Sequence, residues 1–267
     1  MLPDGGGGNL ETIRVTVDER GIALLELNRP DVLNVLSVQL LTEMSAALQA
    51  LGEQAEVRAL IVTGCGRGFC AGADLQSLAD VATRKEPLGQ HVSTAMAQHF
   101  NPMMTLLYSF PRPVVSAING IAAGGGAAIA LCADIVLAAN SAALKVVQVP
   151  QLGIAADLGA NWLLPRMAGR ARALGACLLG DTLKADRLLE WGVVWESVPD
   201  QQLLARSFEL AERLAKVPAE TIVASRRLID NASQQSFEAS LEDERQVQRE
   251  LCDAPFFSSA VLGFLAR

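Results

Sequence analysis

Residues 119–139 read NGIAAGGGAAIALCADIVLAA and place three consecutive glycines, Gly124–Gly126, where an apolar helix is expected to begin. The first turn of a helix leaves backbone N–H groups without intrahelical acceptors and carries partial positive charge, so it can hold an anionic oxygen. Glycine at such a position also allows close packing of the helix against a neighbour. The stretch ends in IVLAA at 135–139, which is typical of a buried strand.

Short apolar segments elsewhere predict a sheet with helical connections. Residues 12–28 alternate around a turn at 18–21, which is typical of a β-hairpin, and Ser37 is suited to cap the helix that follows. Further strands are expected at 59–64, 113–118, 144–149 and 193–198. This order predicts stacked β-β-α units in an α/β fold.

Helices dominate the second half of the chain, from about residue 159 onward. One is expected to begin at Pro218, and a charged amphipathic helix is expected at 236–251. No clear linker divides the sequence. We expect a flexible tail at 1–11, a core at 12–200 and a helical C-terminal region at 201–267.

Composition restricts the classes of partner. The chain has 267 residues and a formal net charge of −7, so it lacks the basic surface that neutralises nucleic-acid phosphates. No apolar run reaches the ~18 residues that cross a bilayer, and we expect no membrane partner. The five cysteines form no C-x-x-C pair and there are two histidines, which predicts reduced thiols, a cytoplasmic location and no metal site.

A second glycine-bearing loop, GCGRGFCAGADL at 64–75, directly follows the strand expected at 59–64. Phe69 stands where a G-x-G-x-x-G fingerprint needs glycine, and the Gly-Lys-Ser/Thr of a phosphate loop is absent. One interpretation is a surface turn; the other is that the small residues Ala71 and Gly72 let a ligand reach backbone N–H groups. Together the two loops can supply two N–H donors, as an oxyanion hole for a thioester carbonyl requires.

Five motifs, in this order, resemble the crotonase (enoyl-CoA hydratase/isomerase) superfamily. They are RGFCAGADL, NGIAAGGGAAIALCADIVLAA, LGIAADLGANWLLPRMAGRARA, GDTLKADRLLEWGVV and FFSSAVLGFLAR, preceded by LELNRPDVLNVLS. The resemblance implies an α/β fold of the ClpP/crotonase type, a spiral of β-β-α repeats with a helical C-terminal trimerisation region. It also implies an acyl-CoA substrate, no permanently bound cofactor other than the coenzyme A of the substrate, and a homotrimer or a dimer of trimers.

The same resemblance implies a set of site residues. The oxyanion hole falls on the backbone N–H groups of Ala71 and Gly125. Coenzyme A is expected along Arg29, Leu33, Cys70, Ala73, Asp74 and Leu75. In the family, the segment at Phe256–Phe257 often contributes to a neighbouring subunit's site, but here Ser259 and Ala260 replace the usual Glu-Gly pair.

The stretch GIAADLG at 153–159 places the carboxylate of Asp157 among small and apolar residues. The two glutamates that position water in hydratases of the family fall on Ala128 and Val149, neither of which can carry a proton. Asp157 instead matches the aspartate of dienoyl-CoA isomerases and ring-opening epoxyphenylacetyl-CoA isomerases. Desolvation in an apolar pocket would raise its pKa and make it a stronger base.

We therefore predict an isomerase in which Asp157 removes a proton from the acyl chain. The N–H groups of Ala71 and Gly125 then hold the resulting enolate, and the double bond moves when the proton is returned elsewhere. The alternative role for Asp157 is to cap the helix that is expected to begin near Gly159.

Other functions stay open at this point. They are hydratase-type chemistry, a nucleophilic Asp157 that hydrolyses or dehalogenates an acyl-CoA with His91 or His99 activating water, and a non-catalytic acyl-CoA-binding homologue. Arg226 and Arg227 are either surface charges or contacts for a coenzyme phosphate.

The sequence does not identify the acyl group. The side chains available to close a ring or a chain are Trp162, Met103, Met104 and Tyr108. Cys70 lies beside the first glycine loop but has no histidine neighbour, which favours a packing role over that of a thiol nucleophile.

Overall fold

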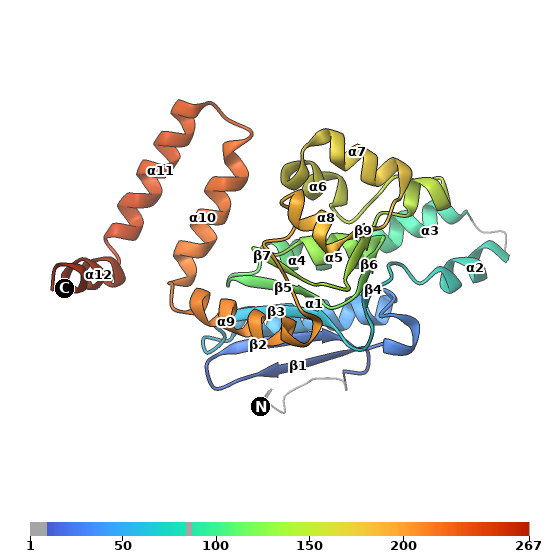
Figure 1. Ribbon diagram of the computed structural model, residues 1–267, viewed down its shortest axis with the longest axis horizontal. Helices are drawn as coiled ribbons and strands as arrows, with labels where there is room; N and C mark the ends of the chain where they lie inside the picture. Colours follow the sequence, from blue (N-terminus) through green and yellow to red (C-terminus); the bar gives the residue numbers. More distant parts are fainter. Residues whose placement is uncertain (1–9, 84–86, 267) are drawn as a thin grey trace.

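The computed structural model describes residues 10–83 and 87–266, and its centre consists of two β-sheets (Figure 1). Most of the tail expected at 1–11 lies outside these residues. Within them, Leu10 packs against the hydrophobic core, and the Glu11 N–H donates to the Glu43 carboxylate at 3.2 Å. The core begins at the N-terminal end of the described chain.

The larger sheet has six strands in the order β1-β2-β3-β5-β7-β10. They are β1 (Ile13–Val17), β2 (Ile22–Leu27), β3 (Ala59–Gly64), β5 (Val114–Ile118), β7 (Ile135–Ala139) and β10 (Glu196–Val198). The β1–β2 hairpin is antiparallel, as predicted, and every later pair is parallel. All residues of β3 and β5 are buried, which is why these strands read as continuous apolar runs.

The smaller sheet has four strands in the order β4-β6-β8-β9. They are β4 (Gly68–Cys70), β6 (Ile121–Ala123), β8 (Ala143–Lys145) and β9 (Leu183–Lys184). The first three follow β3, β5 and β7 directly along the chain, so each pair of strands followed by helix forms one turn of the expected β-β-α spiral. Sequence reading missed β4 and β6, because three residues carry no measurable alternation.

Helices cover both sheets. The described α-helices before residue 200 are α1 (Val38–Glu53), α2 (Leu75–Thr83), α3 (Leu88–Ala95), α4 (Asn101–Tyr108), α5 (Gly125–Leu131), α6 (Ala160–Ala168), α7 (Arg170–Leu179) and α8 (Ala185–Glu190). The Ser37 hydroxyl accepts the Leu40 N–H at 3.2 Å and caps α1 as predicted. Every residue of α5 is buried. The helix α9 (Leu203–Ala215) packs against the larger sheet and contributes Leu203 and Leu210 to the core.

The strand expected at 144–149 is wrong over its second half. The strand β8 ends at Lys145, and the chain enters a π-helical turn, η3 (Gln148–Leu152). The apolar run therefore continues past Lys145 without a sheet partner, and Pro150, which has no N–H to donate to a strand ladder, lies within the turn. This turn brings Gln148 to a buried position beside the glycine loops.

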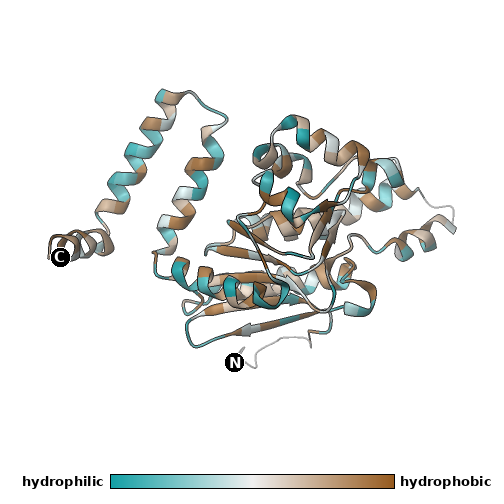
Figure 2. Cartoon of the chain, in the orientation of Figure 1, coloured by the Kyte–Doolittle hydropathy of each residue, from teal (hydrophilic) through white to brown (hydrophobic). Residues whose placement is uncertain are grey.

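The last three helices, α10 (Ala219–Ala232), α11 (Phe237–Cys252) and α12 (Pro255–Leu265), extend away from the rest of the chain (Figure 1). Hydrophobic residues lie along much of α12 (Figure 2). Its exposed apolar side chains are Phe256, Phe257, Val261, Leu262, Phe264 and Leu265. The single chain does not cover this surface.

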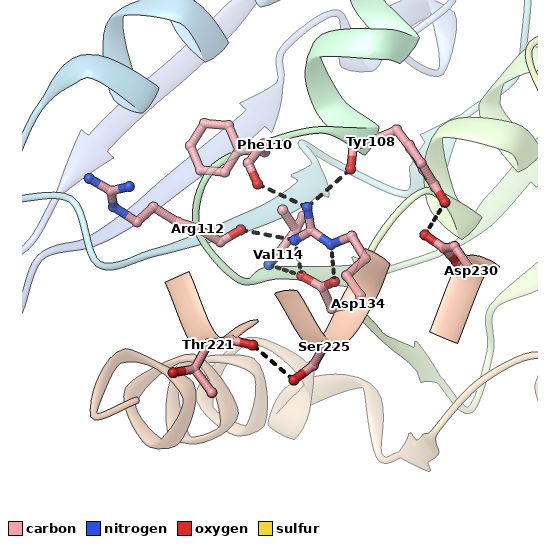
Figure 3. A network of polar contacts seen from close by, with 9 residues as sticks. Tyr108, Phe110, Arg112, Val114, Asp134, Thr221, Ser225 and Asp230 are labelled. Carbon is pink, nitrogen blue, oxygen red and sulfur yellow. Dashed lines mark hydrogen bonds and ion pairs between the residues drawn. The ribbon is translucent and has the colours of Figure 1, made fainter. Parts of the chain in front are cut away.

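Arg226 anchors α10 to the core through Asp134 and the backbone of residues 108–112, which Figure 3 shows from close by. Its guanidinium forms two 2.7 Å contacts with the Asp134 carboxylate and donates to the backbone carbonyls of Tyr108, Phe110 and Arg112. All five N–H donors of the side chain are therefore in use. The sequence left two roles open for Arg226, a surface charge or a contact for a coenzyme phosphate. The structure supports neither role.

Replacing Arg226 with alanine should destabilise the protein by about 3 kcal/mol, because a largely buried carboxylate loses its cation and three carbonyls lose a donor. The Arg226 and Asp134 side chains are 15% and 18% exposed. Denaturant unfolding and hydrogen exchange across α10 measure the effect. Arg227→Ala, on the exposed face of the same helix, is the matched control and should change stability by under about 0.5 kcal/mol. Equal losses in both variants would contradict this role.

Candidate active site

A cavity of about 150 Å³ lies where the two glycine loops, the η3 turn and the helices α2 and α3 meet. Its wall is mostly apolar. The larger apolar side chains in the wall are Leu36, Leu78, Met96, Phe100, Leu152, Ile154 and Leu158. The polar side chains that share the wall are Asp74, His91, Gln148 and Asp157.

The two glycine loops touch each other along their backbones. A Cβ atom on Gly72, which has a φ of 97°, would lie 2.9 Å from the Ala123 carbonyl oxygen and 3.4 Å from the Gly125 nitrogen. A Cβ on Gly126 would lie 2.2 Å from the Cys70 carbonyl oxygen. The close packing expected of these glycines is confirmed, and it brings backbone groups of both loops to one cavity.

Asn34 supports the first glycine loop through hydrogen bonds to its backbone, and the sequence did not point to this residue. This fully buried side chain donates to the carbonyl oxygens of Cys65, Gly68 and Phe69 and accepts the Arg29 N–H at 2.7 Å. The signal in the sequence is Asn34 itself, within LELNRPDVLNVLS, because an amide that follows an apolar run can satisfy loop carbonyls.

The structure revises one of the two expected oxyanion donors. The Ala71 N–H donates to the Leu33 carbonyl oxygen at 2.9 Å, so this amide is already occupied. Two positions later, Ala73 forms a parallel bridge with Leu36, which uses the Gly72 carbonyl and the Asp74 N–H. Successive amides of an extended chain point in opposite directions, so the Ala73 N–H faces away from Leu36.

Gly125, the other expected donor, is the first residue of α5 and lines the cavity. Its N–H is one of the first-turn groups that have no intrahelical acceptor. Ala73 lines the same cavity. Ala73 and Gly125 therefore both lie on the cavity wall, whereas the Ala71 N–H is bonded to the Leu33 carbonyl oxygen.

The residues expected along coenzyme A divide into two groups. Ala73, Asp74 and Leu75 line the cavity, and the Leu75 side chain is exposed at its edge. Arg29 and Leu33 lie outside this wall; Arg29 donates to the Val35 carbonyl and pairs with Asp74 at 3.3 Å. Because Arg29 pairs with Asp74, the positive charge of its guanidinium lies next to the cavity wall.

The assignment of Cys70 to the coenzyme is wrong, because the residue has no exposed surface. It lies under the first turn of α5, against Gly126. Burial raises the pKa of its thiol to about 12, which also removes the thiolate that nucleophilic chemistry would need. Cys70 is the packing residue that the sequence favoured.

Asp157 lies on the cavity wall and does not cap a helix. The helix α6 begins at Ala160 with Gly159 as its N-cap, and it is the Asp157 backbone carbonyl that accepts the Ala160 N–H. The carboxylate Oδ1 accepts a hydrogen bond from Gln148 Nε2 at 3.0 Å. Burial raises the pKa of Asp157, and the Gln148 bond opposes that rise.

Other candidates from the sequence fall on both sides of the cavity boundary. His91 lines it, and His99 does not. Tyr108 and Trp162 line a second cavity against α10, where their rings pack edge to face, so they do not close the acyl site. Met103, like Met104, is part of the hydrophobic core. The apolar wall comes instead from Met96, Phe100 and their neighbours on the π-helical turn η2 (Met96–Phe100) and α3.

The positions of the hydratase glutamates bear no acid. Ala128 is fully buried in α5, and Val149 lies in η3. Among the described residues of the cavity wall, the carboxylates are Asp74, which pairs with Arg29, and Asp157. The described part of the chain contains no cluster of three or more His, Cys, Asp or Glu side chains that could hold a metal ion. No helix within it is long and apolar enough to cross a membrane.

Comparison with known proteins places this geometry in one family. The model of the family described as enoyl-CoA hydratase/isomerase matches residues 18–266. The chain belongs to the enoyl-CoA hydratase/isomerase family. The crotonase fold and an enzymatic role in acyl-CoA chemistry follow from this membership.

Three similar proteins cover almost the whole chain of this family member. The 1,2-epoxyphenylacetyl-CoA isomerase of Escherichia coli is 38% identical over 93% of this chain and 94% of its own. A Rhodobacter capsulatus protein named as a probable enoyl-CoA hydratase is 36% identical over 96% and 95%. The crystal structure of an enoyl-CoA hydratase from Bacillus anthracis has a TM-score of 0.87 and 30% identity, covering 96% of both chains.

Gly126→Ala should destabilise this family member by about 2–3 kcal/mol and disturb the site, because the added Cβ meets the Cys70 carbonyl oxygen at 2.2 Å. Gly175→Ala is the control: it lies inside α7, where a Cβ has nothing within 4 Å. It should stabilise the protein by up to about 1 kcal/mol, because alanine is the better helix former. Urea unfolding of both variants is the measurement, and a neutral Gly126→Ala would refute the packing argument.

Proposed function

We propose that this protein isomerises a double bond or a ring in an acyl-CoA thioester, with Asp157 as the base. The observation that carries the proposal is the position of Asp157, a carboxylate with a raised pKa in an apolar cavity that also presents the amides of Ala73 and Gly125. The thioester oxygen accepts both N–H groups. Each such donor lowers the barrier by about 3 kcal/mol.

The proposed reaction moves one proton. The Asp157 carboxylate takes it from a carbon whose C–H bond is activated by the thioester, and the electron pair of that bond moves into the enolate. The oxyanion hole holds the negative charge on the thioester oxygen. The neutral Asp157 then returns the proton to another carbon of the conjugated system, so the product has the atoms of the substrate and a displaced double bond.

Hydration fits this cavity less well. Adding water to a double bond requires a base for one proton and an acid for another. Ala128 and Val149 supply neither, and Asp74 is paired with Arg29. A reaction that uses a single carboxylate twice is the better match.

The size of the cavity favours a compact acyl group. An apolar cavity of about 150 Å³ is large enough for a benzene ring. The E. coli relative, at 38% identity, is named for a phenylacetyl-CoA derivative. We propose an aryl or short unsaturated acyl group at this site. The coenzyme A moiety would extend out of the cavity past Ala73, Asp74 and Leu75 toward Arg29.

His91 supports a second candidate. It is the histidine that shares the cavity wall with Asp157, as a water-activating partner would. In that reaction an Asp157 carboxylate oxygen attacks a halogen-bearing carbon of the acyl group, the ester bond forms as the carbon–halogen bond breaks and halide leaves, and water hydrolyses the ester to restore Asp157. Turnover in H₂¹⁸O separates the candidates, because hydrolysis of the ester incorporates label and isomerisation does not.

We also propose that the protein assembles with copies of itself through its C-terminal helices. Phe264 and Leu265, on α12, are 77% and 76% exposed, and apolar surface of this kind is normally covered. A homotrimer or a dimer of trimers is the expected state. All five cysteines are free thiols, which fits a cytoplasmic location.

Asp157→Asn should abolish proton exchange and leave binding intact. Wild type and variant are incubated in D₂O with 3-enoyl-, dienoyl- and arylacetyl-CoA thioesters, and mass spectrometry follows deuterium in the acyl chain. We expect exchange in the wild type and at least a hundredfold less in the variant, with similar thioester affinity by calorimetry. Binding without exchange in the wild type would favour the nucleophilic or the non-catalytic function.

The rate should fall as the pH is lowered through the raised pKa of Asp157, because only the ionised form is a base. The acidic limb of the profile should therefore lie above the ordinary aspartate value of about 3.9. A pH profile of the exchange rate is the measurement, and a limb at or below that value would contradict a desolvated base.

The same raised pKa predicts a stability difference. The unfolded chain ionises Asp157 at lower pH than the folded protein does, so its contribution to stability is present below the unfolded pKa and lost as the pH rises through the folded pKa. Asp157→Asn should therefore be more stable than wild type at neutral pH and equal to it in strong acid. Urea unfolding at several pH values checks both signs.

A further inference from the structure

Among the residues that the structure describes, Gln148 is the side chain that bonds to the Asp157 carboxylate, and neither motif nor composition pointed to it. It is the first residue of η3 and is 4% exposed. Its Nε2 lies 3.0 Å from Asp157 Oδ1. A Cβ on Gly124 would lie 3.8 Å from the same Nε2, so the amide stands between the base and the second glycine loop.

The amide occupies this position at a cost. Its other end, Oε1, is buried and has no hydrogen-bond partner among the described residues. A buried carbonyl that leaves water without a new donor is unfavourable, and a leucine or methionine of similar size would avoid that penalty. Packing alone therefore does not account for a glutamine here. The contact that compensates is the bond from Nε2 to Asp157.

We propose that Gln148 is the positioning residue of the base: it fixes Asp157 Oδ1, so that Oδ2 is the oxygen that takes and returns the substrate proton. This inference rests on the proposed function of Asp157. A carboxylate can rotate about its last torsion. The Gln148 N–H, together with the Asp157 backbone N–H, opposes that rotation. The donor also favours the ionised form of a group that burial would otherwise neutralise.

The remaining charges around Asp157 do not substitute for Gln148. The turn that carries Gln148 has no charged residue between 148 and 152. Across the cavity the titratable side chains are Asp74 and His91, and Arg29 is paired with Asp74. Titration of Asp74 and His91 remains in Asp157→Asn, whereas titration of Asp157 does not. Comparison with this variant therefore identifies a change in the ionisation of Asp157 when the Gln148 donor is lost.

The test replaces Gln148 by methionine, which keeps length and volume but has no N–H. We expect the pKa of Asp157 to rise and kcat for exchange to fall roughly tenfold to a hundredfold, while KM changes less than about threefold. Gln151→Met is the matched control, an exposed amide on the same turn that should leave the rate and the pH profile unchanged. Gln148→Leu provides a second variant if the first does not fold.

The pKa of Asp157 is read without turnover from ¹³C-carboxyl NMR spectra, with Asp157→Asn identifying the resonance. A higher pKa in Gln148→Met, with the control unchanged, supports the positioning role even if no thioester exchanges deuterium. An unchanged Asp157 pKa in both Gln148 variants overturns it. Wild-type exchange that stays intact in Gln148→Met also overturns it and leaves Asp157 as the base.

Discussion

The contact between two stretches of backbone is the constraint on which the rest of the structure depends. The loop that follows β3 and the loop that opens α5 approach so closely that Gly72 and Gly126 have no room for a side chain. Because side chains are excluded, amide groups from two distant parts of the chain reach one cavity. The parallel pairing of β4 with β6 and the buried amide of Asn34 hold the loops at this separation.

A cavity built in this way suits chemistry that generates charge on oxygen. Its walls are mostly apolar, its donors are fixed backbone groups, and its one carboxylate without a cationic partner is Asp157, within the described residues. Preorganised donors in a poorly solvated site stabilise a developing oxyanion without reorganising. The same dry environment disfavours the ionised Asp157 and leaves a carbonyl of Gln148 without a donor. Both groups therefore lower local stability at the position proposed for the base.

The C-terminal helices are held in place differently from the buried core. At its root, α10 is held by Arg226, whose five donors reach Asp134 and three carbonyl oxygens. Beyond that anchor the helices extend away from the core, and α12 exposes large apolar side chains such as Phe264. An anchored helix followed by exposed apolar surface supports the proposed assembly of this chain with copies of itself. The anchor determines the direction in which that surface is presented.

The sequence alone predicted the α/β class, the six strands of the larger sheet and the helix that starts at Gly125, and it singled out Asp157, because hydrophobic periodicity, glycine position and an isolated carboxylate are local signals. The sequence did not reveal the features that depend on contacts between residues far apart in the chain. Which of Ala71 and Ala73 offers its N–H is decided by a bridge to Leu36, and the burial of Cys70 by the approach of Gly126. Gln148 faces Asp157 because β8 ends at Lys145 and the chain then turns through η3. Such positions exist only once the two loops have met, so tertiary structure decided them.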